Sequence, residues 1–144
     1  MDATVSMILS RKGSNVVTVI AEDSLASVAD TLTQHRIGAC PVLSRSGEVE
    51  GMISERDIVT AIAREGAAAL NRPVRDVMAR NVLTCSPSDR IGRIMERMTA
   101  ERVRHLPVVM QGELQGIVSI GDVVKERLEE AELEVDALRT YIGS

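Results

Sequence analysis

Two stretches of the sequence, residues 15–59 and 81–124, align with each other and decide the fold. The first reads NVVTVIAEDSLASVADTLTQHRIGACPVLSRSGEVEGMISERDIV and the second reads NVLTCSPSDRIGRIMERMTAERVRHLPVVMQGELQGIVSIGDVV. Internal repetition on this scale is the signature of a structural duplication, so both halves are expected to share one fold. The identical pairs are Asn15/Asn81, Val16/Val82, Thr18/Thr84, Asp23/Asp89, Pro41/Pro107, Val42/Val108, Gly47/Gly112, Glu48/Glu113, Gly51/Gly116, Ser54/Ser119, Asp57/Asp122 and Val59/Val124.

Each copy carries the same order of predicted elements. A short β-branched run, VVTVI at 16–20 or VLTC at 82–85, precedes a helix whose start Asp23 or Asp89 is placed to cap. Two apolar runs around a Gly-containing turn then predict a β-hairpin, and the second run leads into another helix, which gives the order β-α-β-β-α. The first helix of each copy is indicated by the stripes Leu25, Val28, Ala29, Leu32 and Ile91, Ile94, Met95, Met98.

The repeats predict one pseudo-symmetric module. About 60 residues make a marginal hydrophobic core, so neither copy is expected to bury its sheet alone. We predict an α/β (α+β) fold in which two repeats, residues 1–70 and 71–144, pack sheet to sheet and a long helix ends the second. Gly51 and Gly116 are interpreted as bulge or packing glycines.

Composition excludes several classes of function. The net charge is −4 and no run of Lys or Arg occurs, which argues against nucleic acid as a partner. With no Trp, no Phe and a single Tyr, the chain offers no aromatic platform for stacking bases. No stretch approaches the roughly 20 apolar residues that span a bilayer, and no signal peptide is indicated. Cys40 and Cys85 lack metal-ligand or disulfide-framework spacing and are interpreted as buried thiols of a cytoplasmic protein.

The junction between the third strand and the second helix of each copy resembles that of cystathionine-β-synthase (CBS) domains. It reads GMISERD at 51–57 and GIVSIGD at 116–122, and the second copy also carries RHLPV at 104–108. The resemblance runs from about Val5 to about Leu128 and predicts a stand-alone pair of CBS domains. It implies clefts between the repeats that bind an adenosine ligand, with AMP as the leading candidate and ATP, NAD(H) or S-adenosylmethionine as alternatives.

Ser54 with Asp57, and Ser119 with Asp122, allow two interpretations. Ser followed three residues later by an acid is a capping box, which is purely structural. A carboxylate at this junction also accepts both hydroxyls of a ribose, beside helix amides that attract phosphate. The duplication keeps Ser and Asp while the residues between them differ, and together with the resemblance this favours ribose binding by the two aspartates.

The resemblance implies further ligand contacts around the two aspartates. Residues of the first strands offer backbone groups to adenine, although β propensity alone also explains the threonines. Residues next to the prolines form apolar walls around the adenine ring. Pro lies within a strand of both repeats and has no N–H, which predicts an edge or an interruption of the sheet there. The contacts predicted for the base are Thr18, Val19, Ala39, Cys40 and Pro41 in the first repeat, and Thr84, Cys85, His105, Leu106 and Pro107 in the second.

The candidate phosphate ligands differ between the repeats, so two unequal sites are predicted. Arg56 has no counterpart in the second repeat, and Arg104 and His105 have none in the first. Lys12 precedes the first strand and is a fourth candidate. A solvated surface position is the alternative for each Arg. If His105 touches the phosphate and the phosphate keeps its charge, His105 is predicted to raise affinity at the second site as the pH falls from about 7.5 to 6. If both repeats build both sites jointly, either Arg acts on both.

No nucleophile and base pair, metal-ligand cluster or Gly-rich phosphate loop occurs, so catalysis is not expected. The leading hypothesis is an adenine-nucleotide-binding regulatory module that signals energy or redox state to a protein target that the sequence does not identify. The alternative is a dimeric protein-interaction scaffold without a ligand of its own.

A seam of apolar residues in the last predicted helix indicates a homodimer. The spacings alternate between 4 and 3, as in a coiled coil, and CBS modules commonly pair. The alternative is that the seam packs back on its own module, and Leu133, off the seam, suits either arrangement. The seam residues are Val124, Leu128, Ala131, Val135, Leu138 and Ile142.

Overall fold

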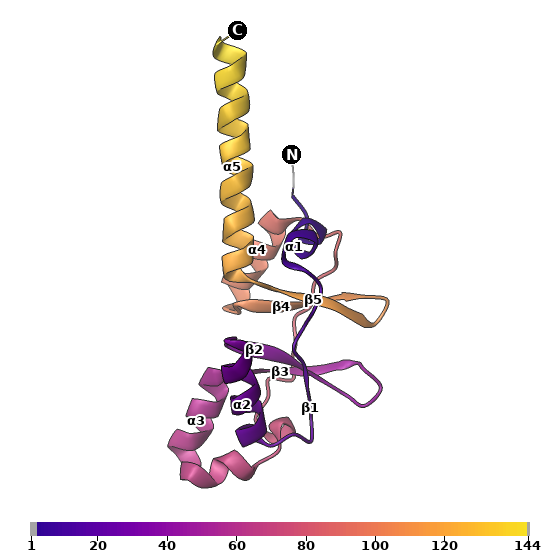
Figure 1. Cartoon of the computed structure of the whole chain (residues 1–144), viewed down its shortest axis with the longest axis vertical. Helices are drawn as coiled ribbons and strands as arrows, with labels where there is room; N and C mark the ends of the chain where they lie inside the picture. Colours follow the sequence, from indigo (N-terminus) through magenta and orange to yellow (C-terminus); the bar gives the residue numbers. More distant parts are fainter. Residues whose placement is uncertain (1–2, 144) are drawn as a thin grey trace. The chain divides into compact units, whose positions relative to one another are not determined.

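The computed structural model describes residues 3–143 and has a mixed α/β fold that ends in a long helix, as predicted (Figure 1). These residues form two compact units. The first-repeat unit comprises residues 15–83 and 112–114, and the second-repeat unit comprises residues 3–14, 84–111 and 115–143. The elements are α1 (Val5–Lys12), β1 (Val19–Ile20), α2 (Leu25–His35), β2 (Ala39–Leu43), β3 (Val49–Ser54), α3 (Glu55–Glu65), the 3₁₀ helices η1 (Gly66–Asn71) and η2 (Val74–Asp76), α4 (Ile91–Glu101), β4 (His105–Met110), β5 (Glu113–Ser119) and α5 (Ile120–Gly143).

The first-repeat unit contains a three-stranded sheet of order β1-β2-β3. β1 runs parallel to β2, and β2 runs antiparallel to β3 with Ala39 opposite Ser54. The turn of this hairpin holds Gly47 at a φ of +89°, a conformation that Gly adopts without a steric penalty. The predicted stripe of α2 is confirmed where it faces the core, because Leu25, Val28 and Leu32 are buried.

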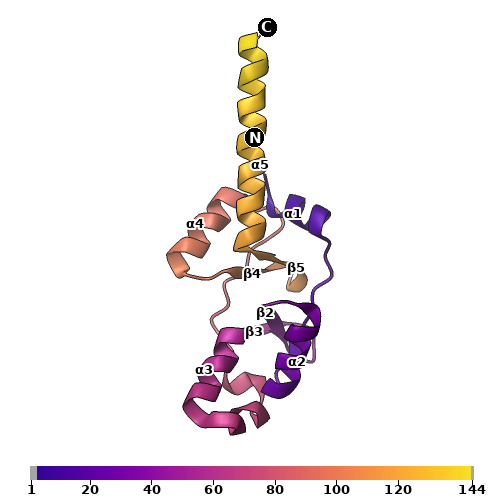
Figure 2. The same cartoon turned by 60° about the vertical axis from the view of Figure 1, so that its left-hand side comes forward.

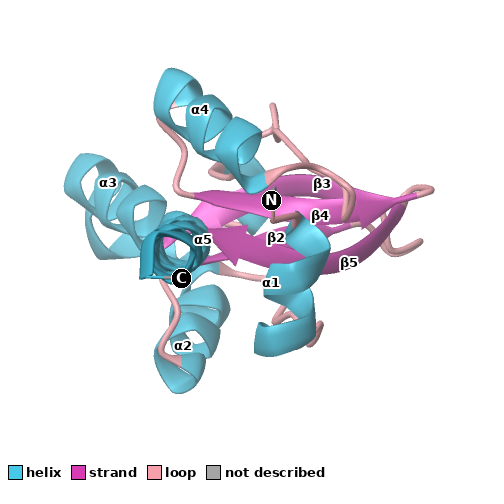
Figure 3. Cartoon of the chain, turned by 90° about the horizontal axis from the view of Figure 1, so that it is seen from above, coloured by secondary structure: helices cyan, strands magenta, loops and turns pink. Residues whose placement is uncertain are grey.

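The second-repeat unit repeats the hairpin as β4-β5 and buries the corresponding stripe of α4, at Ile91, Ile94 and Met98. α1 and α4 lie on different sides of α5 (Figures 2 and 3). α1 belongs to this unit although it precedes the first repeat in sequence. The backbone of Val5 donates to Asp89 O at 2.9 Å, and that of Ile91 donates to Ala3 O at 3.0 Å.

The two compact units do not follow the order of the repeats along the sequence, and the predicted boundary between residues 70 and 71 stays a prediction. The segment that ends at Ser14 packs with the second repeat, and the link up to Leu83 packs with the first. The helix α1 itself was not predicted, because an apolar pattern over eight residues is too short to stand out.

The first strand of each repeat is shorter than predicted. β1 is limited to Val19–Ile20, and in the second repeat only Cys85 forms a parallel bridge, to Val108. Both pairings begin directly after a proline of the neighbouring strand, with Val19 opposite Val42 and Cys85 opposite Val108. Since Pro41 and Pro107 have no N–H, the parallel ladder cannot continue past them, which explains the short pairing.

The predicted helix caps at Asp23 and Asp89 are wrong. Ser24 caps α2, because its hydroxyl accepts from the backbone of Ser27 at 3.1 Å. The Asp23 carboxylate instead accepts from the backbone of Ile20 at 3.0 Å, and Asp89 makes the equivalent bond to Ser86 at 2.9 Å. Each Asp thus closes the turn between the first strand and the helix, as short acidic side chains do in turns.

Gly51 and Gly116 are packing glycines, which agrees with one of the two predicted roles. A Cβ at Gly51 would lie 2.6 Å from Met78 Sδ and 2.7 Å from the backbone oxygen of Ala79. A Cβ at Gly116 would lie 2.6 Å from a terminal methyl group of Leu9. The backbone oxygen cannot move away easily, whereas the end of a Leu side chain can.

Gly51→Ala is therefore expected to lower the free energy of unfolding by about 2 kcal/mol, and Gly116→Ala by less than about 1 kcal/mol. Urea unfolding of both variants, followed by circular dichroism, measures the difference. Equal losses in the two variants would show that the contact with Ala79 does not set the cost.

Candidate functional site

The junction between β3 and α3 forms a capping box. The Ser54 hydroxyl accepts from the backbone of Asp57 at 3.2 Å. In return, Asp57 Oδ2 accepts from the backbone N–H of Ser54 at 2.9 Å and from its hydroxyl at 3.0 Å. The backbone of Glu55 donates to Gly38 O at 2.9 Å, which ties the start of α3 to the segment before β2. The capping box that the sequence indicated at Ser54 and Asp57 is therefore present.

The junction between β5 and α5 repeats this geometry. Asp122 Oδ2 accepts from the backbone of Ser119 at 2.9 Å, and the Ser119 hydroxyl accepts from the backbone of Asp122 at 3.1 Å. The backbone of Ile120 donates to Arg104 O at 2.8 Å, the counterpart of the bond from Glu55 to Gly38. The duplication is thus preserved at the level of single hydrogen bonds.

The capping role leaves part of each carboxylate available. In both repeats the bonds reach Oδ2, and Oδ1 of Asp57 and of Asp122 has no hydrogen-bond partner among residues 3–143. An ionised carboxylate has about four acceptor sites on its two oxygens. Both aspartates are partly exposed. The cap and a bond to an external hydroxyl are therefore compatible on the same side chain.

Lys12 distinguishes the second junction from the first. Its ammonium donates to Asp122 Oδ2 at 2.6 Å and to the backbone oxygen of Ile117 at 3.0 Å. Burial would raise the pKa of Asp122, but the bonds from Lys12 and Ser119 outweigh it and the pKa is lowered. No described cation pairs with Asp57. Lys12 was predicted as a phosphate ligand, and the structure places it in the second-repeat unit.

The other predicted cations lie beside the junctions. Arg56 is exposed in the first turn of α3, and Arg104 is exposed directly before β4. His105 is half-buried at the start of β4. Burial and the positive charge of Lys12 lower the pKa of His105, although Asp122 acts in the opposite direction.

This lowered pKa revises the predicted pH dependence. His105 therefore takes up its proton at a lower pH than an ordinary imidazole, and a ligand phosphate with a pKa near 6 loses charge as the pH falls. AMP affinity at the second site is therefore expected to rise by less than about threefold between pH 7.5 and 6. Calorimetry on Asp57→Ala, with and without His105→Gln, tests this. A rise of more than about threefold that His105→Gln removes would contradict the expectation.

The residues predicted to meet the base lie on the strands that flank each junction. In the first-repeat unit, Thr18 is exposed directly before β1, while the side chains of Val19 and Cys40 belong to the buried core. Ala39 and Pro41 are also buried, with Ala39 opposite Ser54. Contacts from Val19 and Cys40 would thus come from backbone groups.

Pro41 lies at a real interruption of the sheet. Its partner Met52 exchanges backbone bonds of 3.0 and 2.9 Å with Ala79, on the far side of β3. In an antiparallel ladder this makes Pro41 and Met52 a pair without mutual hydrogen bonds. The ring nitrogen of Pro41 then faces β1, whose pairing begins only at Val42. Pro41 therefore leaves no ladder bond unmade, and the predicted interruption is present.

The second-repeat unit has the same arrangement. Thr84 is exposed and Cys85 is buried. The backbone N–H of Cys85 donates to Pro107 O at 3.0 Å, and Cys85 O accepts from the backbone N–H of Val109 at 2.8 Å. Leu106 and Pro107 are buried as well. Each predicted set of residues is thus gathered within one unit.

The two thiols are structural groups. Cys40 and Cys85 are both free and buried, as predicted. Burial raises the pKa of Cys40 to about 11 and that of Cys85 to about 12, so neither is a thiolate at neutral pH. Within residues 3–143 no group of His, Cys, Asp and Glu side chains is arranged to hold a metal ion. The same residues contain no helix with the length and apolar character needed to cross a bilayer.

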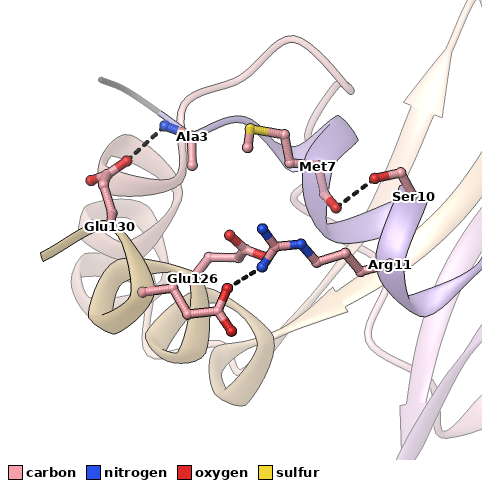
Figure 4. A network of polar contacts seen from close by, with 7 residues as sticks. Ala3, Met7, Ser10, Arg11, Glu126 and Glu130 are labelled. Carbon is pink, nitrogen blue, oxygen red and sulfur yellow. Dashed lines mark hydrogen bonds and ion pairs between the residues drawn. The ribbon is translucent and has the colours of Figure 1, made fainter. Parts of the chain in front are cut away.

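A polar network that the sequence did not indicate joins α1 to α5 (Figure 4). Arg11 donates to Glu126 at 2.8 Å and also pairs with Glu129. Glu130 accepts from the backbone of Ala3 at 2.7 Å. Glu126 is the only buried charged side chain in the described chain. Arg11 and Lys12 are neighbours, so α1 contacts both α5 and the Asp122 junction. No local signal in the sequence connects residues this far apart.

Comparison with known proteins agrees with the repeat. The model of the CBS domain matches residues 5–64 and 74–129. The chain is 32% identical over 148 residues to CBS domain-containing protein CBSX3, mitochondrial, from Arabidopsis thaliana, covering 96% of this chain and 71% of that protein. It is 26% identical over 118 residues to 5′-AMP-activated protein kinase subunit gamma-3 from Bos taurus, covering 77% of this chain and 24% of that protein.

Solved structures give the same result. The CBS-domain containing protein ATU1752 from Agrobacterium tumefaciens is 46% identical with a TM-score of 0.84, covering 88% of this chain and 95% of that one. The CBS domain pair of protein MJ0100, solved with 5′-methylthioadenosine and S-adenosyl-L-methionine, shares the fold at 24% identity and a TM-score of 0.79, covering 92% of this chain and 99% of that one. No catalytic family is indicated. The chain carries two CBS domains and belongs to the CBS-domain family.

Proposed function

We propose that this chain is an adenine-nucleotide-binding regulatory module, with Asp57 and Asp122 as ribose acceptors. The observation that carries the proposal is the carboxylate geometry. In both repeats Oδ2 belongs to the cap, and Oδ1 has no partner in the described chain. A ribose hydroxyl that donates to Oδ1 leaves the helix cap intact.

The starts of α3 and α5 provide groups that can bind the phosphate of the ligand. Asp57 and Asp122 stand in the first turns of α3 and α5, which have 11 and 24 residues. The amide groups of a helix N-terminus and its positive dipole end favour an anion. Arg56 adds a cation in the first repeat, and Arg104 and Lys12 add cations in the second. The assignment of each Arg to its own repeat stays a prediction.

The ligand proposed first is AMP, and ATP, NAD(H) and S-adenosylmethionine are the alternatives. Two relatives support an adenosine ligand. One is the CBS domain pair solved with 5′-methylthioadenosine and S-adenosyl-L-methionine, and the other is named as a subunit of a kinase activated by 5′-AMP. We further propose that the module acts as a homodimer without catalytic activity, in the cytoplasm, and passes its signal to a separate protein target.

Thermal unfolding with AMP, ADP, ATP, NAD⁺, NADH and S-adenosylmethionine tests the proposal. A ligand at 100 times its Kd stabilises the folded state by about 2.7 kcal/mol, which corresponds to a rise in Tm of roughly 9 °C. The variant Asp57→Ala/Asp122→Ala is expected to lose this rise. No shift with any of the six ligands would overturn the proposal.

A protein-interaction scaffold without a ligand is the second candidate, and the exposed apolar residues of α5 favour it. Leu128, Leu138 and Ile142 are 61%, 60% and 80% exposed. Apolar residues gathered on a free surface indicate a contact with another molecule. The thermal test separates the two functions, because a scaffold does not respond to nucleotide.

A further inference from the structure

The seam of α5 is not covered by its own module. Val123 and Glu126, in the first two turns, are the buried residues of the helix. Beyond them, Leu128 is 61% exposed, Val135 46%, Leu138 60% and Ile142 80%. Figures 1 and 2 show this part of α5 extending beyond α1 and α4. The structure therefore does not show the seam packed on its own module, which is the alternative to a homodimer.

We propose that α5 pairs in parallel with α5 of a second copy of this chain. Apolar residues that alternate at spacings of 3 and 4 form a stripe along one face, and two such stripes bury each other in a coiled coil. In heptad notation, the a positions are Leu128, Val135 and Ile142, and the d positions are Val124, Ala131 and Leu138.

The charges beside the seam favour the parallel orientation. In a parallel pair, a residue at g faces the residue five positions further on, at e, of the partner helix. Arg127 at g then faces a second-copy Glu132, and Glu134 faces a second-copy Arg139. Both contacts join opposite charges, and each occurs twice in a symmetric dimer.

An antiparallel pair that buries the whole seam brings like charges together. In this arrangement e positions face e positions, and g positions face g positions. Glu132 therefore meets Glu132, Glu134 meets Glu134, and Lys125 meets Arg139. A shift of one heptad relieves this repulsion but leaves the apolar residues at one end of the seam without a partner. Only the parallel orientation both buries the full seam and places opposite charges beside it.

The flanking side chains are available for these contacts. Glu132, Glu134 and Arg139 are exposed and have no ion pair within residues 3–143. Arg127 donates to Glu130 at 2.6 Å through one guanidinium nitrogen, and its side chain is still 49% exposed. The planar guanidinium has five N–H donors, so a second carboxylate can be bound at the same time.

Light scattering of the full chain without nucleotide tests the pairing. The expected mass at micromolar concentration is twice the 15.6 kDa of one chain. Leu128→Glu and Leu138→Glu should each raise the dimer Kd by roughly 100-fold or more, because a charge replaces a buried apolar contact. Leu133→Glu is the matched control, since Leu133 is also 61% exposed but lies off the seam. A wild-type mass of 15.6 kDa, or a dimer that neither seam variant weakens, overturns the proposal.

Disulfide trapping tests the orientation. In a parallel pair the two copies of residue 142 face each other, so Ile142→Cys should form a covalent dimer on mild oxidation. In the antiparallel pair they lie at opposite ends, roughly 27 Å apart at 1.5 Å per residue. Cys40 and Cys85 are buried and do not compete. Leu133→Cys is the control that should not cross-link, and absence of a covalent dimer with Ile142→Cys overturns the parallel arrangement.

A charge reversal gives an independent reading of orientation. Arg139→Glu places like charges opposite Glu134 in the parallel pair, so the dimer Kd should rise roughly fivefold to tenfold. Glu134→Arg/Arg139→Glu restores opposite charges and should recover most of the loss. In the antiparallel pair Arg139→Glu would strengthen the dimer, and that result contradicts the proposal.

This inference extends the proposed homodimer and does not depend on nucleotide binding. A dimer that shows no thermal response to any nucleotide leaves the α5 pairing in place and removes the proposed ligand. A monomer that responds to AMP does the reverse.

Discussion

Asp57→Ala/Asp122→Ala is expected to abolish AMP binding, and each single replacement to weaken binding at its own repeat by roughly tenfold to 100-fold. The range follows from the loss of a hydrogen bond to a charged acceptor, which contributes about 1.5–3 kcal/mol. Calorimetric titration of AMP into the two single variants and the double variant measures the affinity of each site.

Replacement by Asn separates binding from capping. An Asn amide oxygen at the position of Oδ2 preserves the bond from the backbone of Ser54 or Ser119, while its NH₂ group replaces the unpaired Oδ1 with a donor. Asp57→Asn and Asp122→Asn should therefore lose AMP affinity while retaining most of the folding stability. The Ala variants lose the cap as well, at a cost of about 1 kcal/mol.

Asp23→Asn is a control away from the predicted ribose contact, because the Asp23 carboxylate bonds to the backbone of Ile20. It should leave the AMP affinity unchanged. Unchanged AMP affinity in the double Ala variant would remove both aspartates from the site.

Lys12→Met should weaken AMP binding at the second site by roughly tenfold and leave adenosine binding there undiminished. Two donors of the Lys12 ammonium are used by Asp122 and Ile117 in the structure, so one of its three N–H groups remains for a phosphate oxygen. A charge-assisted bond of this kind contributes about 1.5 kcal/mol or more. Lys12 donates to Oδ2 of Asp122, whereas the proposed ribose contact is Oδ1, so removal of Lys12 leaves the acceptor for a ligand without phosphate in place.

The experiment titrates AMP and adenosine into Lys12→Met on the Asp57→Ala background, which leaves the second site to be measured alone. Lys125→Met is the matched control, since it removes the same charge from an exposed position on α5. An equal loss for AMP and adenosine would show that Lys12 positions the site as a whole and does not select phosphate.

The pH dependence of stability gives a second measurement on the same variant. The pKa of Asp122 is lowered in the folded chain, so its contribution to stability is present above the unfolded pKa and is lost as the pH falls through the folded value. Lys12→Met removes one cause of the lowered pKa. Acid unfolding of the variant is therefore expected to begin at a higher pH than that of the wild type.

The sequence by itself determined the features that depend on neighbouring residues. The apolar stripe of each first helix, the Gly turns of the hairpins and both Ser and Asp boxes were predicted, and each is present in the structure. These elements follow from periodicity, left-handed φ values and hydrogen bonds that span three residues, so the local sequence contains the necessary information. The duplication supplied the topology, because it showed that one order of elements occurs twice.

Only the tertiary structure decided which distant segments meet. Lys12 and Asp122 are 110 residues apart in sequence, and no local pattern indicates that α1 leaves the first repeat to pack with the second. The requirement for Gly at position 51 likewise depends on the approach of Met78 and Ala79, and the short first strands depend on prolines in another strand. Contacts of this kind depend on how helices and strands pack against one another and on how buried polar groups find hydrogen-bond partners. The residues next to each other in the sequence do not indicate these contacts.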